Sequence, residues 1–188
     1  MTESFALGKP YTGAEIERAL MALQDESSAY LAAMPAPAFF APQGDRWSPS
    51  EHTRHLTKSI GAVARGLGMP WIVLRFSFGA HAGASRDLAT MIATYETALE
   101  NPLPVNPFAP EPRAAPADLE AGRTAILARF RGANAELRRA MRRWDERALD
   151  RLRLPHPLLG KLTLREMLLF TLLHNAHHLR LVAKRVGS

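Results

Sequence analysis

Two helix-start signals, each followed by a long apolar stripe, constrain the fold more than any other feature. Ser-Pro-Ser-Glu at 48–51 and Thr-Leu-Arg-Glu at 163–166 both have the form of a capping box, in which a hydroxyl and a glutamate three residues later cap each other's backbone N–H groups. Apolar residues then recur at the helical spacing of about 3.6 residues. The first box therefore predicts a helix that ends at Gly66, Gly68 and Pro70, and the second predicts one that runs to about residue 186.

Two further long segments carry the same periodicity. One runs from about residue 13 to 33, with Thr12 as its N-cap and prolines at 35 and 37 after its end. The other runs from about residue 117 to 145, and a shorter helix is expected from about residue 88 to 100. The apolar stripes of the two long segments are Ile16, Leu20, Leu23 and Leu31 in the first, and Leu119, Ile126, Phe130, Leu137, Met141 and Trp144 in the second.

The part of the chain between these helices contains no convincing strand. No segment shows sustained period-two alternation, and residues 71–76 are the only strand-like run, which a helix extension or a loop would fit equally. Six prolines fall between residues 101 and 116, a density that forbids regular helix and favours an extended connector. The sequence thus predicts an all-α fold, a four-helix bundle, with residues 1–188 as a single domain and a long proline-rich connection between its second and third long helices.

Composition excludes several classes of protein. The chain of 188 residues has no cysteine, so any metal must be bound through nitrogen or oxygen. We expect no signal peptide and no membrane span, since the longest apolar stretch, residues 167–179, is interrupted by Asn175 and three histidines, and hence expect a cytoplasmic protein. The net charge is +6, but the arginines are dispersed without interleaved aromatic residues, which disfavours nucleic-acid binding.

The histidines of the last helix carry the strongest chemical signal. His174 and His178 are four residues apart and so lie on one face, where two imidazoles can bind one metal ion. With a third protein ligand, such a site keeps a coordination position open, as catalytic metal sites do. His177 falls to one side, toward solvent or a supporting position, while His81 and His156 lie in loop contexts and are assigned no ligand role.

The second helix offers two candidates for the third ligand. His52 lies closer than His55 to the centre of the apolar stripe, so periodicity alone favours His52. Small residues at 59, 62 and 66 follow the line of His55, however, and would leave space there for a ligand. Helix geometry leaves this choice open, and buried histidines hydrogen-bonded to the backbone remain the alternative to a metal site.

Three sequence pieces together resemble the DinB-like superfamily, which includes YfiT-like metal-dependent hydrolases and thiol S-transferases. The first is Trp-Ser-Pro at 47–49 followed by Glu51 and by His-Leu at 55–56. The second is the lead-in to the last helix, residues 156–166, and the third is His-Asn-Ala-His-His-Leu at 174–179. With the order of the helices, the resemblance covers nearly the whole chain.

The resemblance implies a bundle whose metal is held by one histidine of the second helix and a pair from the last. Carried over by position, the ligands are His55, His174 and His178, and the implied ion is divalent, nickel or zinc above all. It also implies a homodimer and a small-molecule substrate. Two departures concern the substrate pocket: residues 179–181 lack the glutamine that often follows the double histidine, and the proline-rich insert is longer than expected.

A neutral three-histidine set would leave the charge of the ion uncompensated, which lowers the pKa of a water or thiol ligand. The function that follows is a metal-dependent enzyme, either a thiol S-transferase acting with a low-molecular-weight thiol or a hydrolase. The alternatives are a non-catalytic, stress-related bundle protein that binds a metal or another ligand, and a metal-free bundle. The sequence shows no general base near the site, since the expected role of Glu51 is that of the capping-box glutamate.

Overall fold

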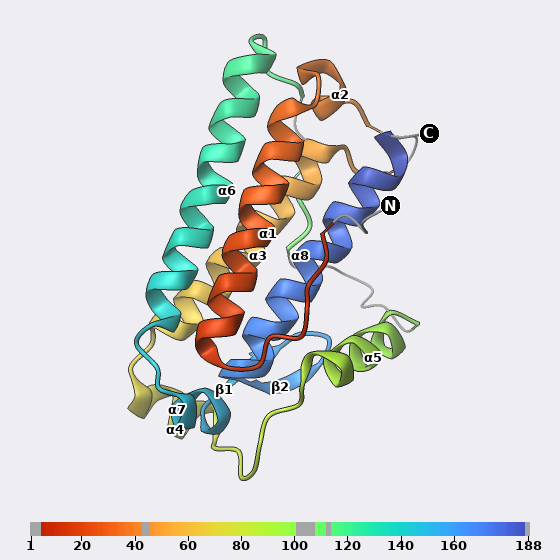
Figure 1. The fold of residues 1–188 in the computed structure, drawn as a ribbon. Helices are drawn as coiled ribbons and strands as arrows, with labels where there is room; N and C mark the ends of the chain where they lie inside the picture. Colours follow the sequence, from red (N-terminus) through yellow and green to blue (C-terminus); the bar gives the residue numbers. More distant parts are fainter. Residues whose placement is uncertain (1–4, 43–45, 101–107, 112–113, 187–188) are drawn as a thin grey trace.

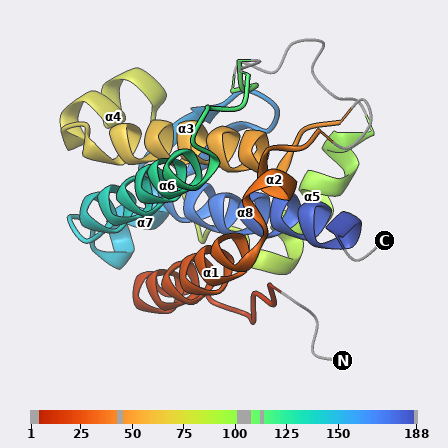
Figure 2. The same ribbon diagram turned by 90° about the horizontal axis from the view of Figure 1, so that it is seen from above.

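The structure, a computed structural model, describes residues 5–42, 46–100, 108–111 and 114–186. Four long helices form the bundle: α1 (Gly13–Ala33), α3 (Pro49–Gly68), α6 (Leu119–Met141) and α8 (Leu164–Val186). Helices α1 and α3 each pack against both α6 and α8, so the four surround a common core (Figures 1 and 2). The all-α, four-helix prediction is therefore confirmed.

The predicted capping boxes open the helices that carry the histidines. At α3, the Glu51 backbone N–H donates to Ser48 Oγ at 3.2 Å and the Ser48 N–H donates to Glu51 Oε2 at 2.7 Å. At α8, Thr163 and Glu166 exchange the equivalent bonds at 3.1 and 3.0 Å. Each box satisfies backbone donors that a helix start leaves without intrahelical partners, which fixes where the helix begins and so the direction of every later side chain.

Helix α8 is buried on nearly all sides along its first half. Residues 162–176 are consecutively buried, because the bundle covers one side of the helix while α5 (Leu88–Leu99) and a β-hairpin cover the other. The hairpin pairs β1 (Arg153–His156) with β2 (Gly160–Thr163) in antiparallel register, Arg153 opposite Thr163. Figure 1 shows α5 and the hairpin beside the lower part of α8.

The hairpin corrects the expectation that the chain forms no strand. Each strand has only four residues, and β1 contains Pro155. Strands this short do not show a recognisable period-two pattern. Three short helices, α2 (Ala36–Phe40), α4 (Trp71–Phe78) and α7 (Glu146–Arg151), complete the described elements. The strand-like run at residue 71 is thus helical, and the third long helix stops at Met141 because Asp145 caps the separate helix α7.

Polar contacts at the start of α8 hold α5 in place. Arg86, just before α5, forms an ion pair with Glu166 at 2.8 Å, and Ser85 Oγ contacts Thr163 Oγ1 at 2.7 Å. Arg165, 1% exposed, donates to Asp150 at 2.6 Å and lies over the ring of Tyr11. These contacts join α5, α7 and the N-terminal segment to the first turn of α8.

The proline-rich connection lies only partly within the described residues. Residues 101–107 and 112–113, and with them most of the predicted connector, are outside that part. The described residues Phe108–Glu111 run along α3, where their carbonyl groups accept hydrogen bonds from the side chains of Arg54, His55 and Lys58. Among the described helices, none has the length and apolarity needed to cross a membrane.

Candidate metal centre

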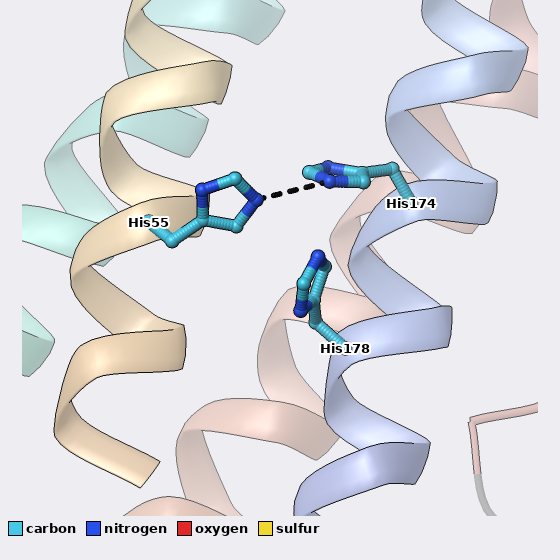
Figure 3. Close-up of side chains that lie close together, drawn as sticks. All are labelled: His55, His174 and His178. Atoms are coloured by element: carbon cyan, nitrogen blue, oxygen red, sulfur yellow. Dashed lines mark hydrogen bonds between the residues drawn. The ribbon is translucent and has the colours of Figure 1, made fainter. Parts of the chain in front are cut away.

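The structure brings together the three histidines named by the resemblance. His55 projects from α3, and His174 and His178 project from successive turns of α8, so that the three rings point toward one another (Figure 3). One ring nitrogen of each lies within 4.8 Å of the others, and the Nε2 atoms of His55 and His174 are 3.1 Å apart. Two nitrogens that each lie about 2.1 Å from one ion, at right-angled or tetrahedral geometry, are separated by about 3.0–3.4 Å.

The second nitrogen of two of these rings is held by a neighbour. His55 Nδ1 is 2.9 Å from the carbonyl oxygen of Phe108, so it donates its hydrogen there and leaves Nε2 with a lone pair facing the cluster. His178 Nδ1 is 2.9 Å from His52 Nδ1. Such contacts to the outer nitrogen orient metal-binding histidines and set their tautomer.

The positions of the rings favour His55 over His52 as the third ligand. His52 is buried and contacts His178, whereas among the described residues the three-histidine group joins His55 to the α8 pair. Trp47 covers the cluster: its ring stacks on His178 at 6.0 Å and lies 5.1 Å from His55. Glu51 takes the capping role expected for it.

Burial keeps the three imidazoles neutral. It lowers the pKa of His55, of His174 and of His178 below the ordinary value, and the proximity of the other rings lowers the pKa values of His174 and His178 further. Metal binding requires unprotonated nitrogens, so this environment supplies the ligands in the correct state at neutral pH.

These residues fit a divalent ion of borderline softness. Three neutral nitrogen donors converge, and imidazole suits zinc, nickel, copper and iron better than magnesium or calcium. In the metal-free protein the Nε2–H of His174 can donate to Nε2 of His55, and a bound cation would replace this hydrogen. The group can thus hold a metal ion through His55, His174 and His178.

The cluster opens into a cavity of about 630 Å³ between α3, α5, α8 and the hairpin. This volume lies within the range of small-molecule sites, about 300–1,000 Å³. All three histidines line it, as do the small residues Ser59, Ala62 and Gly66 that sequence reasoning placed beside His55. A Cβ on Gly66 would approach Leu154 of β1 to 2.9 Å, so glycine allows the hairpin to close this side of the cavity.

Three cavity residues were not foreseen from the sequence. His177, expected either toward solvent or in a supporting position, lines the cavity with its ring 5.8 Å from that of Tyr95. His156 also lines the wall, and its Nδ1 accepts from the backbone N–H groups of Leu158 and Leu159, which places its hydrogen on Nε2. Tyr95 belongs to α5 and His156 to the hairpin. The sequence predicted neither the position of α5 against α8 nor the hairpin, so it carried no signal that places these two residues at the site.

Comparison with known proteins agrees with this arrangement. The chain matches the DinB superfamily over residues 19–182. The chain belongs to the DinB superfamily. Its fold is similar to a solved structure described as "Crystal structure of TT2238, a four-helix bundle protein", with a TM-score of 0.55 and 18% identity over 92% of this chain and 99% of that one. No curated protein matches the chain.

Membership of the superfamily confirms the resemblance drawn from the three sequence pieces, and the matched range includes all three histidines. The structural similarity, at 18% identity, establishes the fold alone. The family match and the three-histidine group together describe a helical protein equipped to bind metal.

Proposed function

We propose that this DinB superfamily protein is a metal-dependent enzyme that binds one divalent ion, nickel or zinc, through His55, His174 and His178. The observation that carries the proposal is the opening of the three-histidine group into a cavity of small-molecule size. Three protein ligands leave coordination positions for a reactant. A bound ion would lower the pKa of a water or thiol that joined it.

The wall of the cavity favours a thiol over water as the nucleophile. Among the described lining residues there is no aspartate or glutamate, which leaves His156 and His177 as the candidates for a general base. Burial raises the pKa of Tyr95 to about 12, so its phenol stays protonated at neutral pH. A thiol loses its proton far more readily than water does. We therefore place thiol S-transfer with a low-molecular-weight thiol ahead of hydrolysis.

The missing carboxylate base also supports a second candidate, a bundle that binds metal or another ligand without catalysis. This protein would have the same metal content and the same cavity. Turnover assays separate the two: consumption of glutathione, bacillithiol or mycothiol together with an electrophile supports the transferase, and hydrolysis of ester or amide panels supports the hydrolase. Metal binding without turnover in either assay would favour the binding protein.

Metal content tests the site itself. We expect about one nickel or zinc ion per chain in the wild type, and a loss of affinity on the order of 100-fold or more in His174→Ala and His178→Ala. His81→Ala is the matched control, because His81 lies outside the cluster. Equal metal content in the wild type and both cluster variants would overturn the proposal, with circular dichroism used to verify that the variants fold.

The single-domain and homodimer predictions remain proposals. Helices α1 and α3 precede the proline-rich connection, and each packs against α6 and α8, which follow it. This interleaving around one core supports a single cooperative unit. A single calorimetric transition would test the domain prediction, and light scattering would test the dimer.

A further inference from the structure

Apart from its histidines, the cavity has an apolar wall with one charged side chain. Val63, Phe78, Met167 and Phe170 are among its apolar residues, and Arg65 is its charged residue within the described part of the chain. A ligand that fills such a space is expected to be largely apolar, and Arg65 is the lining side chain that can pair with a negative charge away from the histidines. The net charge of +6 favours the approach of an anion.

The Arg65 side chain extends toward the N-terminal end of α3, the end that carries His55. It runs back along α3, with Nη1 3.5 Å from the position that a Cβ on Gly61 would take. Glycine at 61 leaves this path open. Gly61 follows His55 by six residues on the same helix, a separation of about 9 Å along the axis. The Nη1 atom thus lies near the level of Gly61 along α3, and Arg65 lines the same cavity as the three histidines.

No carboxylate of the described residues forms an ion pair with Arg65, although Arg54, Arg86 and Arg142 each have one. The Arg65 residue is exposed to solvent and also lines the cavity, which places it at the cavity mouth. A guanidinium group in this position can bind a carboxylate through two parallel hydrogen bonds.

We propose that the substrate occupying this cavity is an elongated apolar carboxylic acid, with its carboxylate at Arg65 and its reacting end at the three histidines. The proposal rests on the proposed function for the identity of the reacting end. Binding of the acid depends on Arg65 and the apolar wall, so it is measurable in metal-free protein.

Calorimetric titration of the metal-free full chain with octanoate and with octanol isolates the carboxylate. We expect octanoate to bind about two- to fivefold more tightly than octanol, the range of an ion pair with an exposed side chain. Arg65→Gln is expected to remove this preference while leaving octanol affinity unchanged. Arg131→Gln, which removes an exposed α6 arginine outside the cavity, is the control with the same change in charge and should keep the preference.

Three results would overturn the inference: no binding of octanoate, equal affinity for octanoate and octanol in the wild type, or the same loss of preference in Arg65→Gln and Arg131→Gln. None of these results depends on metal. Failure of the proposed function would instead appear as unchanged metal content in the His174→Ala and His178→Ala variants, so the two failures are distinguishable.

Discussion

His52 lies outside the three-histidine group, but it can affect metal affinity by orienting the ring of His178. Its Nδ1 lies 2.9 Å from Nδ1 of His178, the α8 histidine that also stacks against Trp47. Contacts of this kind orient a ligand ring, and their loss costs about 10- to 100-fold in metal affinity. We therefore expect His52→Ala to weaken zinc or nickel binding by that amount, measured by competition with a chromogenic chelator.

The His52 variant should retain full occupancy when metal is in excess, because the three proposed ligands are intact. His81→Ala serves again as the comparison. Affinity unchanged from that of the wild type would show that His178 is oriented by its own helix and by Trp47 alone.

Arg165 is the residue on which the start of α8 most depends. It is 1% exposed, and it donates to the carboxylate of Asp150 and to the carbonyl of Tyr11. Arg165→Met would remove the charged partner of the Asp150 carboxylate, which would keep the hydrogen bond from Ser85, and would remove the side-chain donor to the Tyr11 carbonyl, so we expect a loss of about 3–5 kcal/mol in the free energy of unfolding, measured by urea denaturation.

The other partner of Arg165 provides the contrast. Glu146 contacts Arg165 through a side chain that is 58% exposed, and exposed ion pairs contribute about 1 kcal/mol or less. Glu146→Gln should therefore cost far less than Arg165→Met. Similar losses in the two variants would argue against Arg165 as a buried anchor.

At the scale of elements, the sequence predicted the parts whose formation is local. Capping boxes and 3.6-residue periodicity placed α3 and α8 closely, because the bonds at a helix start join residues only three apart. The hairpin at residue 153 escaped prediction because its strands are stabilised by packing on α8 rather than by a pattern of their own. His156, in the hairpin, was missed for the same reason. Helix α5 was predicted, but its packing against α8, which brings Tyr95 to the cavity, depends on tertiary contacts.

The choice of His55 illustrates the limit more sharply. Periodicity on α3 favoured His52, which lies closer to the centre of the apolar stripe. In the structure both His52 and His55 are buried, so burial does not distinguish them. What separates them is where α8 crosses α3, which depends on tertiary packing and which no pattern within α3 encodes. Resemblance to the family supplied this information, and the structure agrees with it in the positions of the rings.

Helix α5 is the element whose attachment can be tested alone. The ion pair between Arg86 and Glu166 and the contact between Ser85 and Thr163 hold its start against α8. Arg86→Gln would remove the ion pair and leave Glu166 to cap α8. We expect amide hydrogen exchange in residues 88–99 to rise about five- to tenfold, with α1 and α6 unchanged, because a locally attached element opens separately from the core.

The result bears on the cavity, because α5 contributes Tyr95 and Leu99 to its wall. Arg75→Gln, a change on the exposed helix α4, is the comparison and should leave α5 exchange at the wild-type rate. Faster exchange throughout the bundle in Arg86→Gln would mean instead that the ion pair supports the whole fold.

At the scale of the whole molecule, the buried histidines link folding to protonation and, under the proposed function, to metal binding. Burial lowers the pKa values of His55, His174 and His178 below 6.5, so these rings stay neutral in the folded chain while they become protonated in the unfolded chain as the pH falls through 6.5. The unfolded state then binds more protons than the folded state does. The free energy of unfolding of metal-free protein is therefore greatest above pH 6.5 and decreases on acidification, by about 1 kcal/mol at pH 5.5 for each of His174 and His178, whose pKa values are lowered furthest.

Metal bound to the folded state would increase the free energy of unfolding, and the lowered pKa values of the histidines determine how this increment depends on pH. Metal at about 100 times its dissociation constant stabilises the folded state by about 2.7 kcal/mol. Protons compete weakly for folded-state rings with lowered pKa values, so this increment should be nearly the same at pH 7.5 and pH 5.5, although both metal-free and metal-loaded protein lose stability between them. Urea denaturation at the two pH values, with chelator and with zinc, measures all four quantities.

His174→Leu provides the control, since it removes one proposed ligand and one buried titrating ring. The zinc increment should disappear in this variant, and the loss of stability between pH 7.5 and 5.5 should shrink by about 1 kcal/mol. An increment that vanishes at pH 5.5 in the wild type, as it would for rings of ordinary pKa, would show that protons reach the folded cluster. Burial would then not be what keeps His55, His174 and His178 ready to bind metal.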